Sequence, residues 1–144
     1  MSTRAQRRQA IATAIGAAFP GSPVFADPVT NLLQGTQTAD LAFALSRGVR
    51  SLDPSVEMGA VIQNMSELWE VYFLIPRTSS TATSEDRADA VFELLQDTLA
   101  PRTGFVPGGA GASEMELKEE DVWTRDAQAG SIYYAIYEND FWEG

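Results

Sequence analysis

The 144-residue sequence contains no cysteine and no histidine, and its only lysine is Lys118. Without cysteine the chain cannot form disulfides or thiolate metal sites, and a reducing compartment is permitted. The lack of histidine removes the commonest general base and the commonest ligand for transition metals. No apolar run approaches the ~18 residues that a membrane-spanning helix needs. These absences predict a soluble protein that is not an enzyme and that binds no metal or cofactor.

Positive charge is scarce beyond the first 50 residues. Residues 1–50 contain five arginines and two acidic side chains, whereas residues 51–144 contain five basic and eighteen acidic side chains. Binding to nucleic acid needs cations that displace counterions from phosphate, so this chain, with its net charge of −10, is not expected to bind DNA. An acidic surface either serves solubility or forms a wall past which DNA slides without binding.

The N-terminal segment imitates a secretory signal, because three arginines precede a mildly apolar run. The run is rich in alanine and is interrupted by Thr13 and Gly16, which is unlike a signal sequence. We therefore predict an amphipathic helix over Arg4–Ala18. Four apolar residues recur on one of its faces with helical spacing: Ile11, Ala14, Ile15 and Ala18.

The central part of the sequence predicts strands and turns. Phe19–Asn31 is expected to be a loop or a short extended piece. Leu41–Leu45 alternates as a strand does, although its alanines also allow a helix. Gly48–Pro54 is predicted to be a turn, and Val56–Met65 is ambiguous between a strand and an irregular lead-in. Glu67–Pro76 is apolar on both faces, which predicts either a central strand or a strand whose second face meets another subunit.

A second amphipathic helix is predicted over Glu85–Leu99, with Thr83 or Ser84 as its N-cap. Strands are predicted over 115–124 and from Ser131 onward, separated by a turn at 126–130. The helix presents one apolar stripe to the sheet: Ala88, Val91, Phe92, Leu95 and Leu99. The predicted fold is therefore α+β, with a mixed or antiparallel sheet of about four to five strands. Both helices pack on this sheet in a single domain covering residues 1–144.

Two segments resemble functional sites and have simpler explanations. Gly108–Ser113 is rich in glycine like a phosphate loop, but no Gly-Lys-Ser/Thr follows it, so a flexible loop is favoured. An acidic group between 114 and 121 has the ligand type for Ca²⁺ or Mg²⁺ without the spacing of a calcium loop, which favours an exposed acidic face. No two carboxylates are placed at a separation that would define a hydrolase.

The order of these elements resembles the tail terminator, or tail completion, proteins of long-tailed bacteriophages. The resemblance covers the chain from about residue 5 and is carried by three features. These are the N-terminal helix, the succession of strand, polar loop and amphipathic helix over 67–99, and the aromatic, acidic final strand ending Ile136-Tyr-Glu-Asn-Asp-Phe141. It is a likeness of element order and size, and no catalytic or binding signature is carried over with it.

The resemblance implies a structural virion protein of the tail and neck, assembled in the host cytoplasm. Such proteins form a ring, expected to be hexameric, that caps the tail tube, ends its polymerisation and joins it to the head connector. The implied partners are further copies of the chain, the tail tube protein and the head–tail connector or adaptor protein. DNA would pass through the ring without specific binding. The alternatives are another neck or head–tail adaptor protein, or a small acidic module that binds a basic partner protein.

Contacts in such a ring are expected from two loops, 77–84 and 104–113, and from the C-terminal stretch Tyr137–Trp142. Exposed loops can become ordered on assembly, and exposed aromatic side chains are enriched at subunit interfaces. The predicted interface residues are Arg77, Phe105, Tyr137, Phe141 and Trp142.

Overall fold

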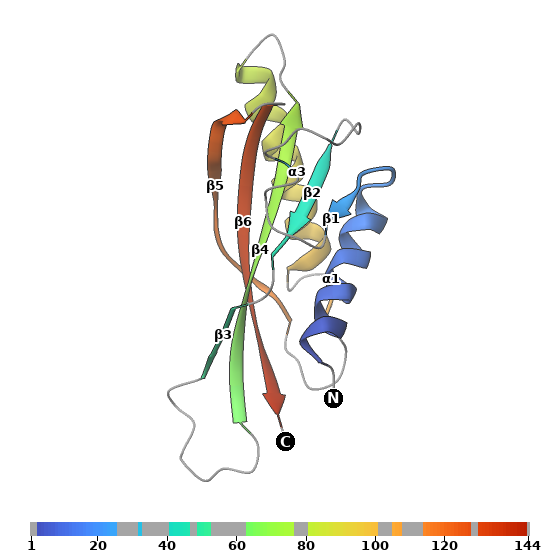
Figure 1. The fold of residues 1–144 in the computed structure, drawn as a ribbon, viewed down its shortest axis with the longest axis vertical. Coiled ribbons are helices and arrows are strands. Elements are labelled where there is room, and N and C mark those ends of the chain that lie inside the picture. Colours follow the sequence, from blue (N-terminus) through green and yellow to red (C-terminus); the bar gives the residue numbers. More distant parts are fainter. Residues whose placement is uncertain are drawn as a thin grey trace.

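The computed structural model describes residues 3–25, 32, 41–46, 49–52, 63–76, 81–100, 105–107, 114–127 and 130–143. The described residues form two helices and one mixed sheet, so the predicted α+β class is confirmed (Figure 1). Neither described helix is long and apolar enough to cross a membrane. The elements are α1 (Arg4–Ala18), β1 (Val24–Phe25), β2 (Ala42–Leu45), β3 (Val49–Leu52), β4 (Gln63–Pro76), α3 (Thr81–Leu99), β5 (Glu116–Ala127) and β6 (Gly130–Glu143).

The sheet has the order β1-β2-β4-β6-β5, and β3 also pairs with β4. β1 and β2 are parallel, and all other described pairs are antiparallel. This sheet has six strands, against the four to five that the sequence predicts. The additional strands, β1 and β3, are too short to show a periodic pattern of their own.

The long strands β4 and β6 pair along their whole length, from Gln63 opposite Glu143 to Pro76 opposite Gly130. Their lower ends extend beyond the two helices (Figure 1). β3 pairs with the first half of β4, from Leu52 opposite Met65 to Val49 opposite Leu68. The predicted turn over Gly48–Pro54 is therefore wrong at residues 49–52, because the exposed edge of β4 provides backbone partners that local sequence does not reveal.

Helix α1 has the predicted bounds, and its start is fixed by a capping box. The hydroxyl of Thr3 accepts a hydrogen bond from the backbone N–H of Gln6 at 3.1 Å, and the Gln6 side-chain oxygen accepts one from the Thr3 N–H at 2.8 Å. After the helix the chain turns at Gly21, whose φ of +82° is a conformation that side chains with a Cβ rarely adopt.

Helix α3 begins at Thr81, one turn earlier than predicted. Thr83 and Ser84 lie inside the helix, so the prediction that one of them is the N-cap is wrong. Serine and threonine are enriched at caps because of a side-chain bond, but their helix propensity is only moderately poor, so they are tolerated inside the first turn. The predicted apolar stripe of α3 is confirmed, since all five of its residues are buried: Ala88, Val91, Phe92, Leu95 and Leu99.

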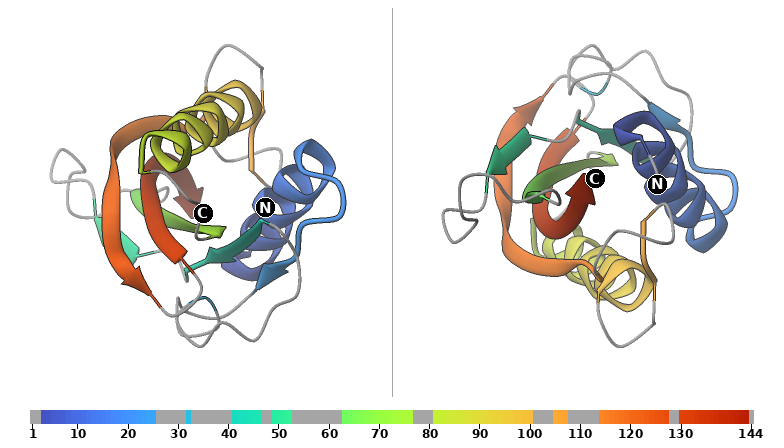
Figure 2. Two further views of the ribbon diagram at one scale, coloured as in Figure 1. Left: turned by 90° about the horizontal axis from the view of Figure 1, so that it is seen from above. Right: turned by 90° about the horizontal axis from the view of Figure 1, so that it is seen from below.

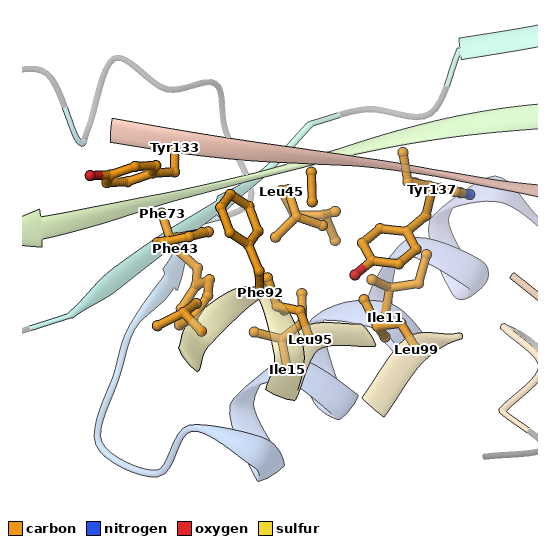
Figure 3. Close-up of a cluster of buried hydrophobic side chains, with 14 of the residues drawn as sticks. Ile11, Ile15, Phe43, Leu45, Phe73, Phe92, Leu95, Leu99, Tyr133 and Tyr137 are labelled. Carbon is orange, nitrogen blue, oxygen red and sulfur yellow. The ribbon is translucent and has the colours of Figure 1, made fainter. Parts of the chain in front are cut away.

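Both helices lie on the same side of the curved sheet (Figure 2) and contact one another. The main core fills the space between them and the sheet (Figure 3). β4 contributes Trp69, Val71, Phe73 and Ile75, which alternate along the strand, share one face and are all fully buried. On the opposite face of the sheet a second, smaller cluster surrounds Leu32. β4 therefore is a central strand with apolar contacts on both faces, as one of the two predicted alternatives required.

A buried ion pair fixes α1 to β4. The Nε and Nη2 atoms of Arg7 donate to the two carboxylate oxygens of Glu67 at 2.7 and 2.5 Å. Both residues are at most 1% exposed. Next to this pair, the indole N–H of Trp69 donates to Asn139 Oδ1 at 2.7 Å, which links β4 to β6. Planar, bidentate pairing of this kind fixes orientation as well as distance, so α1 has a defined position on the sheet.

Candidate functional site

Of the five predicted interface residues, the structure describes the side chains of Phe105 and Tyr137. Arg77 lies outside the described residues. Phe105 is half-buried and packs against the main core. The backbone of Phe141 and Trp142 continues β6, opposite Met65 and Asn64 of β4. Their side chains lie outside the described part of the structure.

Tyr137 points into the core of its own subunit and is 0% exposed (Figure 3). This side chain is therefore unavailable to a partner in the described conformation, and its inclusion among contact residues is corrected. Alternation explains the error. β6 has one face against the helices, and Tyr133, Ala135 and Tyr137 share that buried face. The outward residues of β6 are Tyr134, Ile136 and Glu138.

Replacing Tyr137 by phenylalanine should leave stability unchanged or raise it by about 1 kcal/mol. The Tyr137 hydroxyl is buried and has no hydrogen-bond partner among the described residues. Burial, followed by the charge of Glu120, raises the pKa of this hydroxyl. The hydroxyl therefore stays protonated, and ionisation does not offset the cost of burying it without a hydrogen bond. Urea denaturation measures the change. Tyr133→Phe is the matched control, because the Tyr133 hydroxyl donates to Glu85 at 3.3 Å. A clear loss of stability in Tyr137→Phe would contradict this prediction.

An aromatic patch lies on the sheet face opposite the helices. The Tyr72 ring meets those of Trp123 and Tyr134, with centroids 5.9 and 6.3 Å away. Trp123 is 43% exposed. The hydroxyl of Tyr72 donates to Glu70 at 2.7 Å, and burial and this carboxylate raise the Tyr72 pKa. The patch therefore combines exposed ring surface with negative charge, a combination found where basic side chains bind.

The acidic group predicted from the sequence lies along β5 and its approach. All five residues are exposed, which confirms an exposed acidic face: Glu114, Glu116, Glu119, Glu120 and Asp121. In the described part of the chain no group of three or more candidate ligands could hold a metal ion. Lys118 of the same strand pairs with Glu116 at 3.5 Å.

A cavity of about 180 Å³ lies between α3 and β5. Its lining includes carboxylates from both elements, together with Arg125, whose guanidinium binds Glu85 at 2.8 Å. Burial and the nearby charge of Asp89 raise the pKa of Glu120. Raised carboxylate pKa values in clefts accompany acid–base catalysis in some proteins. In the described residues, burial and repulsion between neighbouring acidic side chains explain the raised pKa of Glu120.

Replacing Glu120 by glutamine should stabilise the protein slightly more at pH 7 than at pH 4. The folded state raises the pKa of Glu120, so Glu120 favours folding at low pH and loses that contribution as the pH rises through the folded-state pKa. The stabilising effects of Glu120→Gln at pH 7 and at pH 4 should differ by less than about 1 kcal/mol, because the side chain is exposed. Denaturation at both pH values measures it. Glu116→Gln on the same strand is the control, and an equal response of both variants would contradict the prediction.

A second cavity, of about 330 Å³, lies at the other edge of the sheet between α1, β1 and β2. We call it the arginine groove, and it is lined by Ala5, Arg8, Gln9, Ala12, Val24, Phe25 and Leu45. Arg8 Nη2 donates to the carbonyl oxygen of Leu45 at 2.9 Å. Arg8 Nε is buried and has no acceptor among the described residues. Sequence reasoning missed this groove, because residues 5–12 and residue 45 meet only in the fold.

The fold is shared with solved structures, although no protein-family model and no curated protein matches the sequence. One chain in a structure of the virion of a native gene transfer agent particle aligns with a TM-score of 0.56 and 15% identity, over 99% of this chain and 96% of that chain. A second solved structure aligns with a TM-score of 0.54 and 16% identity, over 96% and 92% of the two chains. Structural alignments of this quality at such low sequence identity establish that the fold is shared. They do not by themselves establish the function.

The correspondence spans both chains almost completely in each comparison. The overall fold is therefore shared along nearly the whole chain. The surfaces described above lie on that shared frame. They are the aromatic patch, the acidic cavity and the arginine groove.

Proposed function

We propose that this chain is a structural virion protein, a tail terminator whose copies form a ring on the end of a phage tail tube. The ring, hexameric in this proposal, ends polymerisation of the tube and joins it to the head connector. The observation that carries the proposal is the full-length fold correspondence with a chain of a gene transfer agent virion. The order of elements in the sequence, which resembles tail terminators, supports the same class of protein.

The surface chemistry is consistent with a ring subunit. A closed ring of identical copies needs two different surfaces on each subunit that bind one another. The described part of this chain has contrasting edges, with α1 carrying arginines and no acidic residue and β5 carrying mainly carboxylates. With a net charge of −10 on each copy, a ring would have an acidic surface past which DNA moves without binding.

The proposal is tested by the oligomeric state and by activity in tail assembly. Native mass spectrometry at micromolar concentration should detect closed rings. Adding the purified protein to tail tubes that polymerise without a length limit should stop their growth, as electron micrographs would show. A chain that stays monomeric at every concentration and never associates with tubes would contradict the proposal.

One alternative belongs to the same neck assembly. A head–tail adaptor or completion protein would share the virion role but bind the connector and leave tube length unchanged. The length measurement separates this alternative from a tail terminator. The acidic cavity between α3 and β5 also fits a small module that binds one basic partner protein. Such a module would form a one-to-one complex that weakens strongly with salt, and it would form no ring.

A further inference from the structure

The two edges of the sheet have complementary chemistry. β1 and β5 are the outermost strands, so they lie at opposite edges. Figure 1 shows α1 beside β1 on one side of the molecule and β5 on the other. The helix at the first edge has no acidic residue, and its Arg4 and Arg8 are half-buried, whereas Arg7 is buried against Glu67. The strand at the second edge has exposed carboxylates at Glu116, Glu119, Glu120 and Asp121.

The arginine groove at the first edge has an unused donor. Its walls are apolar apart from Arg8 and Gln9. Leu45 occupies only one nitrogen of the Arg8 guanidinium, and Nε is buried without an acceptor in the described residues. A buried donor without a partner is unfavourable, and a carboxylate is the acceptor that best matches a guanidinium. The groove therefore fits a carboxylate flanked by an apolar or aromatic side chain.

The second edge has that combination. Trp123 is 43% exposed and lies close in sequence to Glu119 and Asp121 on β5. We call these three residues the acidic edge. Charges on an edge strand also hinder unspecific strand pairing. The three register irregularities of β5, at 117–119, 122–124 and 124–127, hinder such pairing as well. A partner for this edge must therefore supply positive charge.

We propose that the acidic edge of one copy binds in the arginine groove of a second copy. A carboxylate of Glu119 or Asp121 accepts hydrogen bonds from the guanidinium of Arg8, and the ring of Trp123 covers the apolar wall of the groove. This inference rests on the proposed ring and names its subunit contact. Two acidic edges repel one another, as do two arginine helices, so the contact is head-to-tail. Such a contact leaves one edge of each copy free for the next copy and closes when the rotation permits.

The test uses two variants of the full chain. The groove variant is Arg8→Ala, and the edge variant combines Glu119→Ala, Asp121→Ala and Trp123→Ala. Each variant alone should need at least about tenfold more protein than the wild type to form rings, because removing one partner of a close charge pair mainly accelerates dissociation. A one-to-one mixture retains one intact contact per pair. Native mass spectrometry should therefore find heterodimers without rings.

The controls distinguish loss of this contact from loss of folding and from failure of the ring proposal itself. Glu93→Ala with Asp97→Ala removes two exposed charges from α3 and should leave ring formation unchanged. If Arg8→Ala lowers the thermal midpoint, Ala5→Trp fills the groove from an exposed position and should give the same loss of rings. Rings formed by both variants at the wild-type concentration would overturn this contact while leaving the ring intact. A monomeric wild type would overturn both.

Discussion

Replacing Arg7 by leucine should lower the free energy of unfolding by about 3–5 kcal/mol. The substitution leaves the carboxylate of Glu67, which is 0% exposed, without the guanidinium that binds both of its oxygens. A buried, unpaired charge is far more costly than the net benefit of the pair, since each ion loses its hydration on folding. Urea denaturation followed by circular dichroism measures the loss, and Glu67→Leu should have a similarly large effect.

The double variant Arg7→Leu with Glu67→Leu distinguishes pairing from packing. It should recover much of the lost stability, because no isolated charge remains buried and the two side chains can pack. Arg125→Ala is the matched control, because Arg125 forms an ion pair with Glu85 at 2.8 Å in which both side chains are 39–49% exposed. Arg125→Ala should lower the free energy of unfolding by less than about 1 kcal/mol. Equal losses for Arg7→Leu and Arg125→Ala would contradict this account of the pair.

Replacing Phe73 by alanine should lower the free energy of unfolding by about 3–5 kcal/mol. The ring of Phe73 is fully buried between the sheet and α3 (Figure 3). It contacts three other rings, with centroid distances of 6.0 Å to Phe43, 5.0 Å to Phe92 and 5.5 Å to Tyr133. The variant would lose both transfer free energy and these aromatic contacts, and it would leave a cavity. Thermal and urea denaturation measure the change.

The exposed Leu94 of α3 provides the comparison for Phe73. It is 39% exposed, so Leu94→Ala should change stability by no more than about 0.5 kcal/mol. Phe73→Leu should fall between the two, since it preserves much of the apolar volume. If Phe73→Ala and Leu94→Ala have similar effects, the position of the core between helix and sheet is wrong.

The periodic elements were predictable from sequence alone. α1 has the predicted bounds and buries Ile11 and Ile15, because an apolar residue every three to four positions specifies both the helix and its inward face. The stripe of α3 and the buried face of β4 follow from the same reasoning with periods of 3.6 and 2. Residues without such a pattern were misassigned. β3 lies where a turn was predicted, because its partner in β4 is remote in sequence.

The surfaces could be predicted only in part. The acidic character of β5 is a matter of composition, and all of its described acidic residues are exposed. Tyr137 was expected at an interface and is in the core, because an aromatic strand does not show from its sequence which face is covered. The roles of Arg77, Phe105, Phe141 and Trp142 as interface residues remain predictions.

The sequence by itself determined the α+β class, the two amphipathic helices and the charge asymmetry, because these depend on composition and on spacing along a short stretch of chain. The tertiary structure alone decided that Arg7 pairs with Glu67, sixty residues away, and that Arg8 lines a groove beside Leu45. Such contacts join segments that are distant in sequence, and they depend on how the sheet curves and where each helix packs on it. Local sequence preferences do not contain that information.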